Sequence, residues 1–227
     1  MKNTLFIIVA VLTATFVFAQ NPHLKDEKVF EVKSGIVEYQ SEGMTKGTKT
    51  LWFDDYGRLQ ATHTVSVTKL MGITNKEERL EIRTHEWLYS IDLTAKTGTR
   101  TKLDVAMTPS NDMVKDMTPA ERKQFEESVK KGLNAREAGT GEILGKTCVI
   151  MEIGQGNKSW IYKNIPLKTE VQMGMMKVTE TAIKFEEGAI VSASKFQVPQ
   201  GITITDQTQE MQDAMRMIMQ GMEEGEE

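Results

Sequence analysis

The stretch Leu59-Gln60-Ala61-Thr62-His63-Thr64-Val65-Ser66-Val67-Thr68 decides the fold class. Apolar and polar side chains alternate along it with a period of two, which is typical of a strand with one face in a core. Asp54-Asp55-Tyr56-Gly57 comes just before it and predicts a hairpin turn to the apolar Leu51-Trp52-Phe53. This part of the chain therefore predicts an antiparallel sheet.

Strand-like patterns extend from this hairpin in both directions. Upstream, Phe30 and Val32 alternate in one phase and Val37 and Tyr39 in the other, so we expect a bulge at Ser34-Gly35. Downstream, residues 81–93 are expected to form one long strand. Its predicted common face consists of Arg83, His85, Trp87, Tyr89 and Ile91.

Residues 108–133 interrupt the strand pattern with helical signals. Thr118-Pro119-Ala120-Glu121 has the form of a capping box with proline at the first helical position. Phe125 and Val129 share one helical face, and Gly132 suits a C-terminal stop. We expect a helix over residues 119–131, preceded by a shorter one near Met113, Val114 and Met117.

Strand patterns resume near residue 147 and continue to about residue 204. The expected strands cover residues 147–153, 159–163, 167–173, 176–186 and 189–198. Two runs of strands with a helical interruption, rather than regular alternation of strand and helix, argue against a parallel sheet. We predict a mainly β (α+β) fold with a C-terminal helix, in which Met211, Met215, Ile218 and Met222 form an apolar stripe.

The first 19 residues predict an export signal. Lys2 precedes an apolar run over residues 5–18, and Val17-Phe18-Ala19 provides a site for cleavage between Ala19 and Gln20. The run is shorter than the ~18–20 residues of a spanning helix. We expect a periplasmic or secreted protein with no integral membrane span after cleavage. The expected organisation is a signal peptide (1–19), one β-rich domain (20–205), and a Met-rich helix with an acidic tail (206–227).

The composition excludes several classes of protein. The 227 residues include 28 Lys+Arg and 32 Asp+Glu, for a net charge of −4, so no nucleic-acid footprint is indicated. The mean hydropathy of −0.37 excludes a multi-span membrane protein. The single cysteine excludes a disulfide framework and a Cys-rich zinc module.

No motif predicts catalysis, a metal ion or a cofactor. Residues 141–147 resemble a phosphate loop, but Thr140 stands where that loop needs glycine and a strand pattern follows. His23, His63 and His85 lack metal-ligand spacing. Cys148 lies in an apolar run, where a thiol is usually inert. These signals favour a protein that is not an enzyme.

The 15 methionines gather in two places, Met173-Gly174-Met175-Met176 and residues 211–222. Methionine fills irregular apolar space, so packing or hydrophobic contact is the favoured interpretation. Thioethers also select Cu(I), which leaves copper binding open. An amphipathic Met-rich helix can also dock on a partner protein.

Several short motifs resemble the outer-membrane lipoprotein carrier (LolA-like) superfamily and the uncharacterised exported domains that share its fold. They are Gly145-Lys146-Thr147-Cys148, Trp160-Ile161-Tyr162-Lys163, Ile165-Pro166-Leu167-Lys168-Thr169-Glu170 and the closing Phe196-Gln197-Val198-Pro199-Gln200-Gly201-Ile202-Thr203-Ile204. Trp52-Phe53-Asp54-Asp55-Tyr56-Gly57-Arg58 is similar to the early hairpin of those domains. The similarity follows the chain in order over most of residues 29–205.

This resemblance implies a curved antiparallel half-barrel. Helices inserted between the two runs of strands would fill its concave face and leave an apolar cavity for acyl chains. Two features depart from the carrier. It opens with a long amphipathic helix, where this chain has only the polar residues 20–28, and it uses a buried arginine in its early strands, for which Arg58 and Arg83 are candidates.

The leading hypothesis is an exported, non-catalytic envelope protein that binds a lipid or a lipoprotein acyl chain in a cavity under the sheet. The candidate lining residues are Met71, Trp87, Met151, Met173 and Met176. An alternative is a protein-interaction module that uses Met211, Met215, Ile218 and Met222 on an envelope partner. Cu(I) binding by the methionine clusters is a second alternative.

Overall fold

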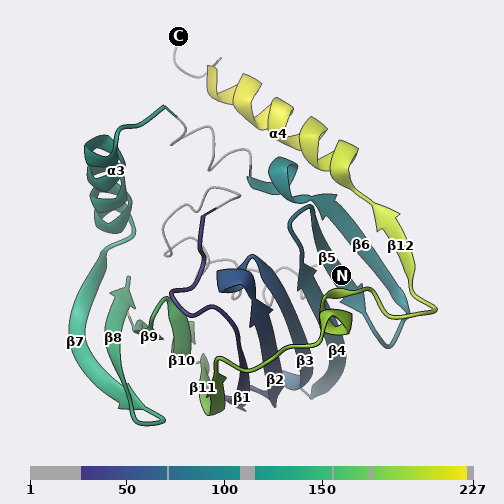
Figure 1. Ribbon diagram of the computed structural model, residues 1–227, viewed down its shortest axis with the longest axis horizontal. Coiled ribbons are helices and arrows are strands. Elements are labelled where there is room, and N and C mark those ends of the chain that lie inside the picture. Colours follow the sequence, from purple (N-terminus) through teal and green to yellow (C-terminus); the bar gives the residue numbers. More distant parts are fainter. Residues whose placement is uncertain (1–26, 71, 108–115, 155, 174–175, 224–227) are drawn as a thin grey trace.

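The sheet is the main feature of the computed structural model, which describes residues 27–70, 72–107, 116–154, 156–173 and 176–223. Its twelve strands lie in the order β12-β6-β5-β4-β3-β2-β1-β11-β10-β9-β8-β7. Figure 1 shows the sheet curving between β7 and β12 without closing into a barrel. The predicted mainly β fold, with helices between two runs of strands, is confirmed.

The first run of strands is a chain of antiparallel hairpins. It consists of β1 (Gly35–Gly43), β2 (Thr45–Asp54), β3 (Leu59–Leu70), β4 (Ile73–Arg83), β5 (Trp87–Asp92) and β6 (Thr97–Lys102). The predicted turn before β3 is present as the short 3-10 helix η1 (Asp55–Gly57), where the Asp54 carboxylate accepts the Asp55 N–H at 2.7 Å.

The second run continues the sheet on the other side of β1. It consists of β7 (Ala135–Ile143), β8 (Lys146–Ile153), β9 (Asn157–Tyr162), β10 (Ile165–Met173) and β11 (Met176–Glu187), whereas the last strand, β12 (Thr203–Asp206), lies at the opposite edge of the sheet. β11 pairs with β1 and joins the two runs. β12 pairs with β6 in parallel, which is an exception to the expected antiparallel pairing.

Three helical segments accompany the sheet. Residues 103–107 are helical, α3 is Pro119–Gly132 and α4 is Thr208–Glu223. The predicted capping box is present, because the Glu121 N–H donates to Thr118 Oγ1 at 3.3 Å and the Thr118 N–H donates to Glu121 Oε2 at 2.7 Å. The shorter helix expected near Met113 lies largely outside the described residues. Figure 1 shows α3 beside β7 and α4 near β6, at opposite ends of the sheet.

The prediction of one long strand over residues 81–93 is wrong. The chain turns at Thr84, whose hydroxyl accepts the N–H groups of Glu86 at 3.3 Å and Trp87 at 2.9 Å. The Thr84 N–H also donates to the Trp87 carbonyl at 2.8 Å. A threonine hydroxyl can compete in this way with the hydrogen bonds of a strand. Residues 73–83 and 87–92 are therefore two antiparallel strands.

The strand predicted over residues 189–198 is also wrong. This segment leaves the sheet and contains the 3-10 helix η2 (Ala193–Phe196), capped by the Ser192 hydroxyl. Phe196 is buried with Ala61 and Ile82, so the apolar pattern reflects contact with a sheet face rather than strand pairing. We call residues 188–202 the crossover segment, because it carries the chain from β11 to β12.

The bulge near the N-terminus is displaced from its expected position. Residues 29–34 lie outside the strands, and β1 begins at Gly35. The register shift in the β1–β11 pair falls between Glu38 and Tyr39 instead of at Ser34-Gly35. Phe30 packs edge-on against Phe53, with ring centroids 5.0 Å apart. Its burial explains an apolar pattern that resembled a strand.

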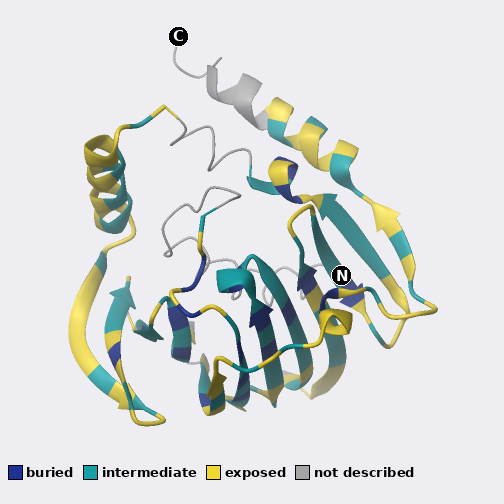
Figure 2. Ribbon diagram, in the orientation of Figure 1, coloured by how far each residue is buried: buried dark blue, intermediate teal, exposed yellow. Residues whose placement is uncertain are grey.

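The first run of strands has two covered faces, which we name after neighbouring residues of β2. The Phe53 face carries a core closed by residues 29–32, and the Trp52 face carries a second core under the crossover segment. Figure 2 shows buried positions along the central strands. The buried members are Val29, Phe30, Val32, Val37, Tyr39, Leu51, Phe53, Cys148, Ile165, Leu167 and Ala182 in the first core, and Ala61, Ile82, Ile91 and Phe196 in the second.

A carboxylate at the end of β11 links three strands of the second run. Glu187 accepts hydrogen bonds from Lys146 Nζ at 2.7 Å, Lys163 Nζ at 2.7 Å and the Tyr162 hydroxyl at 3.2 Å. The two ammonium groups lower the pKa of Glu187 to about 2. The network holds the ends of β8, β9 and β11 together.

Candidate binding site

The Phe53 face changes from apolar to polar between β2 and β3. In the sheet register, Phe53 lies opposite Gln60 and Leu51 lies opposite Thr62. Gln60 in turn lies opposite Arg83, and Thr62 opposite Glu81. The polar side of the period-two pattern therefore points to the same side of the sheet as the first core, and it brings charged residues of β4 there.

Most charges on this face are paired. Lys49 forms an ion pair with Glu180, and Arg79 forms one with Glu77. The four side chains are about one-fifth to one-quarter exposed, at 24%, 24%, 28% and 20% respectively. These pairs compensate for the removal of four charges from water.

Arg83 is different, because its guanidinium has no acidic partner among the described residues. Its Nε atom is buried and makes no hydrogen bond. Among the described residues, the polar contact of the group is a 4.0 Å approach of Nη2 to the Met107 sulfur, a weak acceptor. Burial lowers the pKa of Arg83. A half-buried charge without an acidic partner destabilises a fold, so it suggests a function that requires it.

Glu81 lies two residues before Arg83 on the same face of β4, about 7 Å away along the strand. Glu81 itself is exposed to solvent. The Phe53 face thus presents a guanidinium without an acidic partner among the described residues next to an accessible carboxyl group. Such a pair can accept an anionic or carbonyl group and, beside it, a hydrogen-bonding group.

The helical turn at residues 103–107 lies against this part of the sheet. Leu103 and Val105 are only 1% and 7% exposed, and the Leu103 N–H donates to the Glu86 carbonyl at 2.7 Å. Met107 of the same turn reaches Arg83. The helical insertion therefore reaches the guanidinium through the Met107 side chain.

Of the two candidate arginines, Arg83 is the one without a partner. Arg58 Nη2 donates to the Asp55 carboxylate at 2.6 Å, within the turn between β2 and β3. Sequence alone does not separate the two. The alternation of Glu77, Arg79, Glu81 and Arg83 with residues of the other face does signal a charged strand face.

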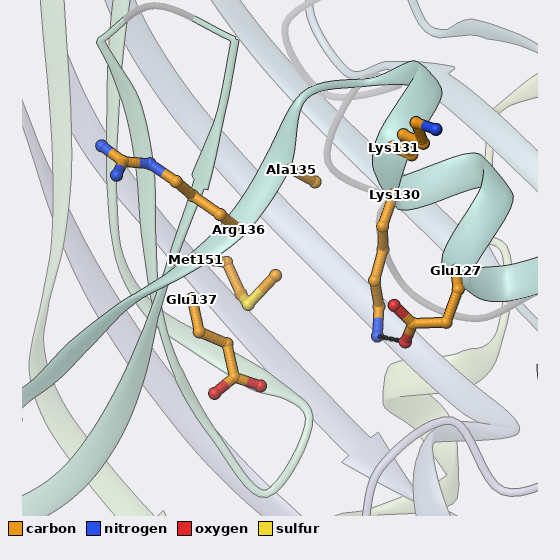
Figure 3. Close-up of a pocket in the computed structure, with 7 residues that line it drawn as sticks. All are labelled: Glu127, Lys130, Lys131, Ala135, Arg136, Glu137 and Met151. Atoms are coloured by element: carbon orange, nitrogen blue, oxygen red, sulfur yellow. Dashed lines mark hydrogen bonds and ion pairs between the residues drawn. The ribbon is translucent and has the colours of Figure 1, made fainter.

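Met151 lies on the Phe53 side of the sheet, in a row with Ser159, Thr169 and Glu180. It lines a pocket of about 240 Å³ between α3 and β7. Figure 3 shows Met151 among charged side chains there, including Lys130 and Glu127, which form an ion pair at 3.0 Å. This pocket is polar, unlike the dry acyl cavity that the sequence led us to expect.

Trp87 lies on the Trp52 face, opposite Lys102 in the register. The Arg100 guanidinium lies 4.1 Å from the centroid of the Trp87 ring, and the Lys102 ammonium lies 6.0 Å from it. The structure thus places Trp87 and Met151 on opposite sides of the sheet and does not bring them into one site.

The remaining candidate ligand residues lie at the ends of strands. Met173 and Met176 face each other in the register where β10 meets β11. Their side chains, like the whole of Met71, fall outside the described residues. Copper binding at this methionine cluster stays a prediction. Among the His, Cys, Asp and Glu side chains in the described ranges, no group of three or more is placed to hold a metal ion.

The candidate partner residues lie on α4. Met211 is 39% exposed and Met217 is 67% exposed, while Met215 is half-buried. Ile218 and Met222 belong to the helix, but their side chains are outside the description. The predicted terminal helix is therefore present, and at least two of its methionines face solvent. None of the helices within the described ranges is long and apolar enough to cross a membrane.

The histidines and the cysteine do not assemble a reactive site. His63 Nε2 lies 2.9 Å from the Glu78 carboxylate, and His85 Nε2 lies 3.4 Å from that of Asp55. Cys148 is fully buried, and burial raises the pKa of its thiol. A raised pKa keeps the thiol protonated, which agrees with the inert role expected from the sequence.

The sequence matches no family model and no curated protein. Among solved structures, the chain is similar to an uncharacterized conserved protein from Thermus thermophilus, with a TM-score of 0.48 at 9% identity over 86% of this chain and 99% of that one. It is also similar to MucB, with a TM-score of 0.43 at 11% identity over 85% of this chain and 66% of that one. LprF from Mycobacterium bovis has a TM-score of 0.33 at 10% identity over 81% of this chain and 96% of its own. TM-scores below 0.5 do not transfer a function to this chain.

Proposed function

We propose that this protein is a non-catalytic binding protein of the cell envelope that holds an amphiphilic ligand, an acyl chain with an anionic or carbonyl headgroup, on its Phe53 face. The observation that carries the proposal is Arg83, whose buried Nε has no hydrogen-bond partner. A headgroup oxygen would supply that partner. The export signal expected in residues 1–19 and the resemblance to lipoprotein carriers support the same function.

The two parts of the ligand would meet two parts of the face. The headgroup would bind Arg83, with Glu81 beside it. The acyl chain would run toward Leu51 and Phe53, beneath the helical turn at residues 103–107. Acyl burial contributes about 0.8 kcal/mol per CH₂, so a long chain needs no further specific contact.

Binding requires the helical insertion to move, because Leu103, Val105 and Met107 occupy the side of the face where Arg83 lies. The weak Arg83–Met107 contact would break and the headgroup would replace the sulfur. A charge-assisted hydrogen bond is about twice as strong as a neutral one, which favours the exchange. Capture and release would then follow movement of the insertion, and no covalent bond would form or break.

Displacement of a fluorescent fatty acid tests this function. We expect wild-type protein to bind the probe and Arg83→Met to bind it at least tenfold more weakly, since one charged hydrogen bond contributes about 1.5–3 kcal/mol. Arg136→Met is the matched control, because Arg136 is 72% exposed and its ion pair in the described part of the chain is with Glu152 at 2.9 Å. Equal binding by wild type and Arg83→Met would disprove the assigned headgroup site.

A second candidate function is favoured by the exposure of Met211 and Met217 on α4. The helix contacts the sheet through β6, so much of its surface is available to a partner protein. Removal of residues 206–227 should abolish recovery of an envelope partner and leave probe binding intact. Partner recovery that survives the deletion would exclude α4 as the docking element.

A further inference from the structure

Three hairpins end side by side at one end of the sheet. The strands β4, β3, β2, β1, β11 and β10 are consecutive neighbours, so the β3–β4, β1–β2 and β10–β11 hairpins form a row. The register aligns their turns, because Thr45 lies opposite Thr68 and Gly43 lies opposite Val178. The six strands span about 24 Å at about 4.8 Å per spacing.

Apolar side chains lie at the ends of these hairpins. Ile73, the first residue of β4, is 67% exposed. Met44 connects β1 to β2, and its carbonyl accepts the Lys69 N–H at 3.2 Å. An exposed isoleucine at a hairpin end, near the half-buried Met44, suits a hydrophobic neighbour better than water.

Three lysines lie near the same hairpin ends on the Trp52 face, whereas Ile73 lies on the Phe53 face, so the two groups meet at the end of the sheet. Val67 lies opposite Lys46 on one side and Lys76 on the other. Lys69 is two residues further along β3 on the same face, and all three lysines are exposed. We call these three residues the lysine triad.

The triad has no acidic partner in the described structure. Glu42 near the end of β1 and Lys46 near the start of β2 form no ion pair within the described residues. The next lysine of this face, Lys177, is already paired with Glu170 at 2.9 Å. Three like charges around Val67 repel one another, and an anion would relieve that repulsion.

We infer that this hairpin end is a docking surface for a bilayer that contains anionic phospholipid. The lysine triad would face the lipid phosphates, and Ile73 and Met44 would enter the headgroup region. Each basic residue near an anionic membrane contributes about fivefold in affinity, so the triad contributes on the order of 100-fold. Separate hairpin ends suit a deformable lipid surface. The inference does not depend on the proposed ligand at Arg83, which lies near the other end of β4.

Sedimentation with vesicles tests the inference, using full-length chains with identical N-termini at about 150 mM salt, where exposed charges still act over about 8 Å. Wild type should bind vesicles of phosphatidylcholine with about one-third phosphatidylglycerol far better than phosphatidylcholine alone, and binding should fall as salt rises. We expect vesicle affinity to fall on the order of 100-fold in the triple variant Lys46→Gln/Lys69→Gln/Lys76→Gln and about tenfold in Ile73→Ser.

The matched control changes the exposed Lys33, Lys123 and Lys131 to Gln, which removes the same charge elsewhere. It should bind like wild type. Unchanged binding by the triad variant, an equal loss in the control, or indifference of wild type to phosphatidylglycerol would each overturn the docking surface. Displacement of the fluorescent fatty acid should be the same in all these variants, so failure here and failure of the Arg83 site are distinguishable.

Discussion

Arg83 is the residue on which the proposed ligand binding depends. A half-buried charge without an acidic partner among the described residues destabilises the native state, whereas an apolar side chain of similar length does not. We therefore predict that Arg83→Met raises the free energy of unfolding by about 1–3 kcal/mol in urea. A loss of stability would mean that Arg83 has a structural partner and would remove the main support for the binding site.

Glu187 gives the fold a defined response to acid. Its folded-state pKa of about 2 lies below the ordinary value, so its stabilisation is complete above about pH 4.5 and is lost as the pH falls toward 2. Because the Glu187 carboxylate is partly exposed, we expect its ion pairs to contribute only about 1 kcal/mol to the free energy of unfolding. Urea unfolding at several pH values should show Glu187→Gln destabilised at pH 7 and equal to wild type near pH 2. A difference that persists at pH 2 would contradict this assignment.

At the scale of elements, α3 depends on local interactions because none of its residues is buried. Loss of a threonine cap costs about 1 kcal/mol, so Thr118→Ala should speed amide hydrogen exchange across α3 about fivefold. Ser128→Ala is the control, since the Ser128 hydroxyl bonds only to the Phe125 carbonyl within the helix. Equal exchange in Thr118→Ala and wild type would show that tertiary contacts hold the helix.

The elements also show where sequence reasoning succeeds. Alternation predicted β3 and the capping box predicted α3, because each signal is local. The turn at Thr84 was missed, since one hydroxyl interrupts an otherwise regular pattern there. The crossover segment was taken for a strand, because Phe196 and its apolar neighbours have the alternation of a strand but pack on a sheet face.

The candidate site was harder to predict than the fold. A period of two separates two faces of a strand but does not say what covers each face. In this sheet both faces of the central strands are covered. The register places Trp87 and Met151 on opposite sides. Arg83 could be named from the family resemblance, but its lack of a partner depends on where Met107 and the acidic residues lie in space.

At the scale of the whole molecule, the curved sheet keeps the three proposed binding surfaces apart. The Phe53 face holds Arg83 beneath the helical insertion, the hairpin end carries the lysine triad, and α4 extends from the far edge beside β6 (Figure 1). The proposed function requires this separation, because a ligand held on one face must not block contact with a membrane or a partner.

Native mass spectrometry of the protein purified from its own host envelope tests the central claim most directly. We predict that wild type carries an additional mass of an amphiphile with an acyl chain, and that Arg83→Met from the same host is largely free of it while Arg136→Met retains it. A wild-type spectrum with the mass of the bare chain alone, or an equally loaded Arg83→Met, would contradict the claim that Arg83 on the Phe53 face holds the ligand.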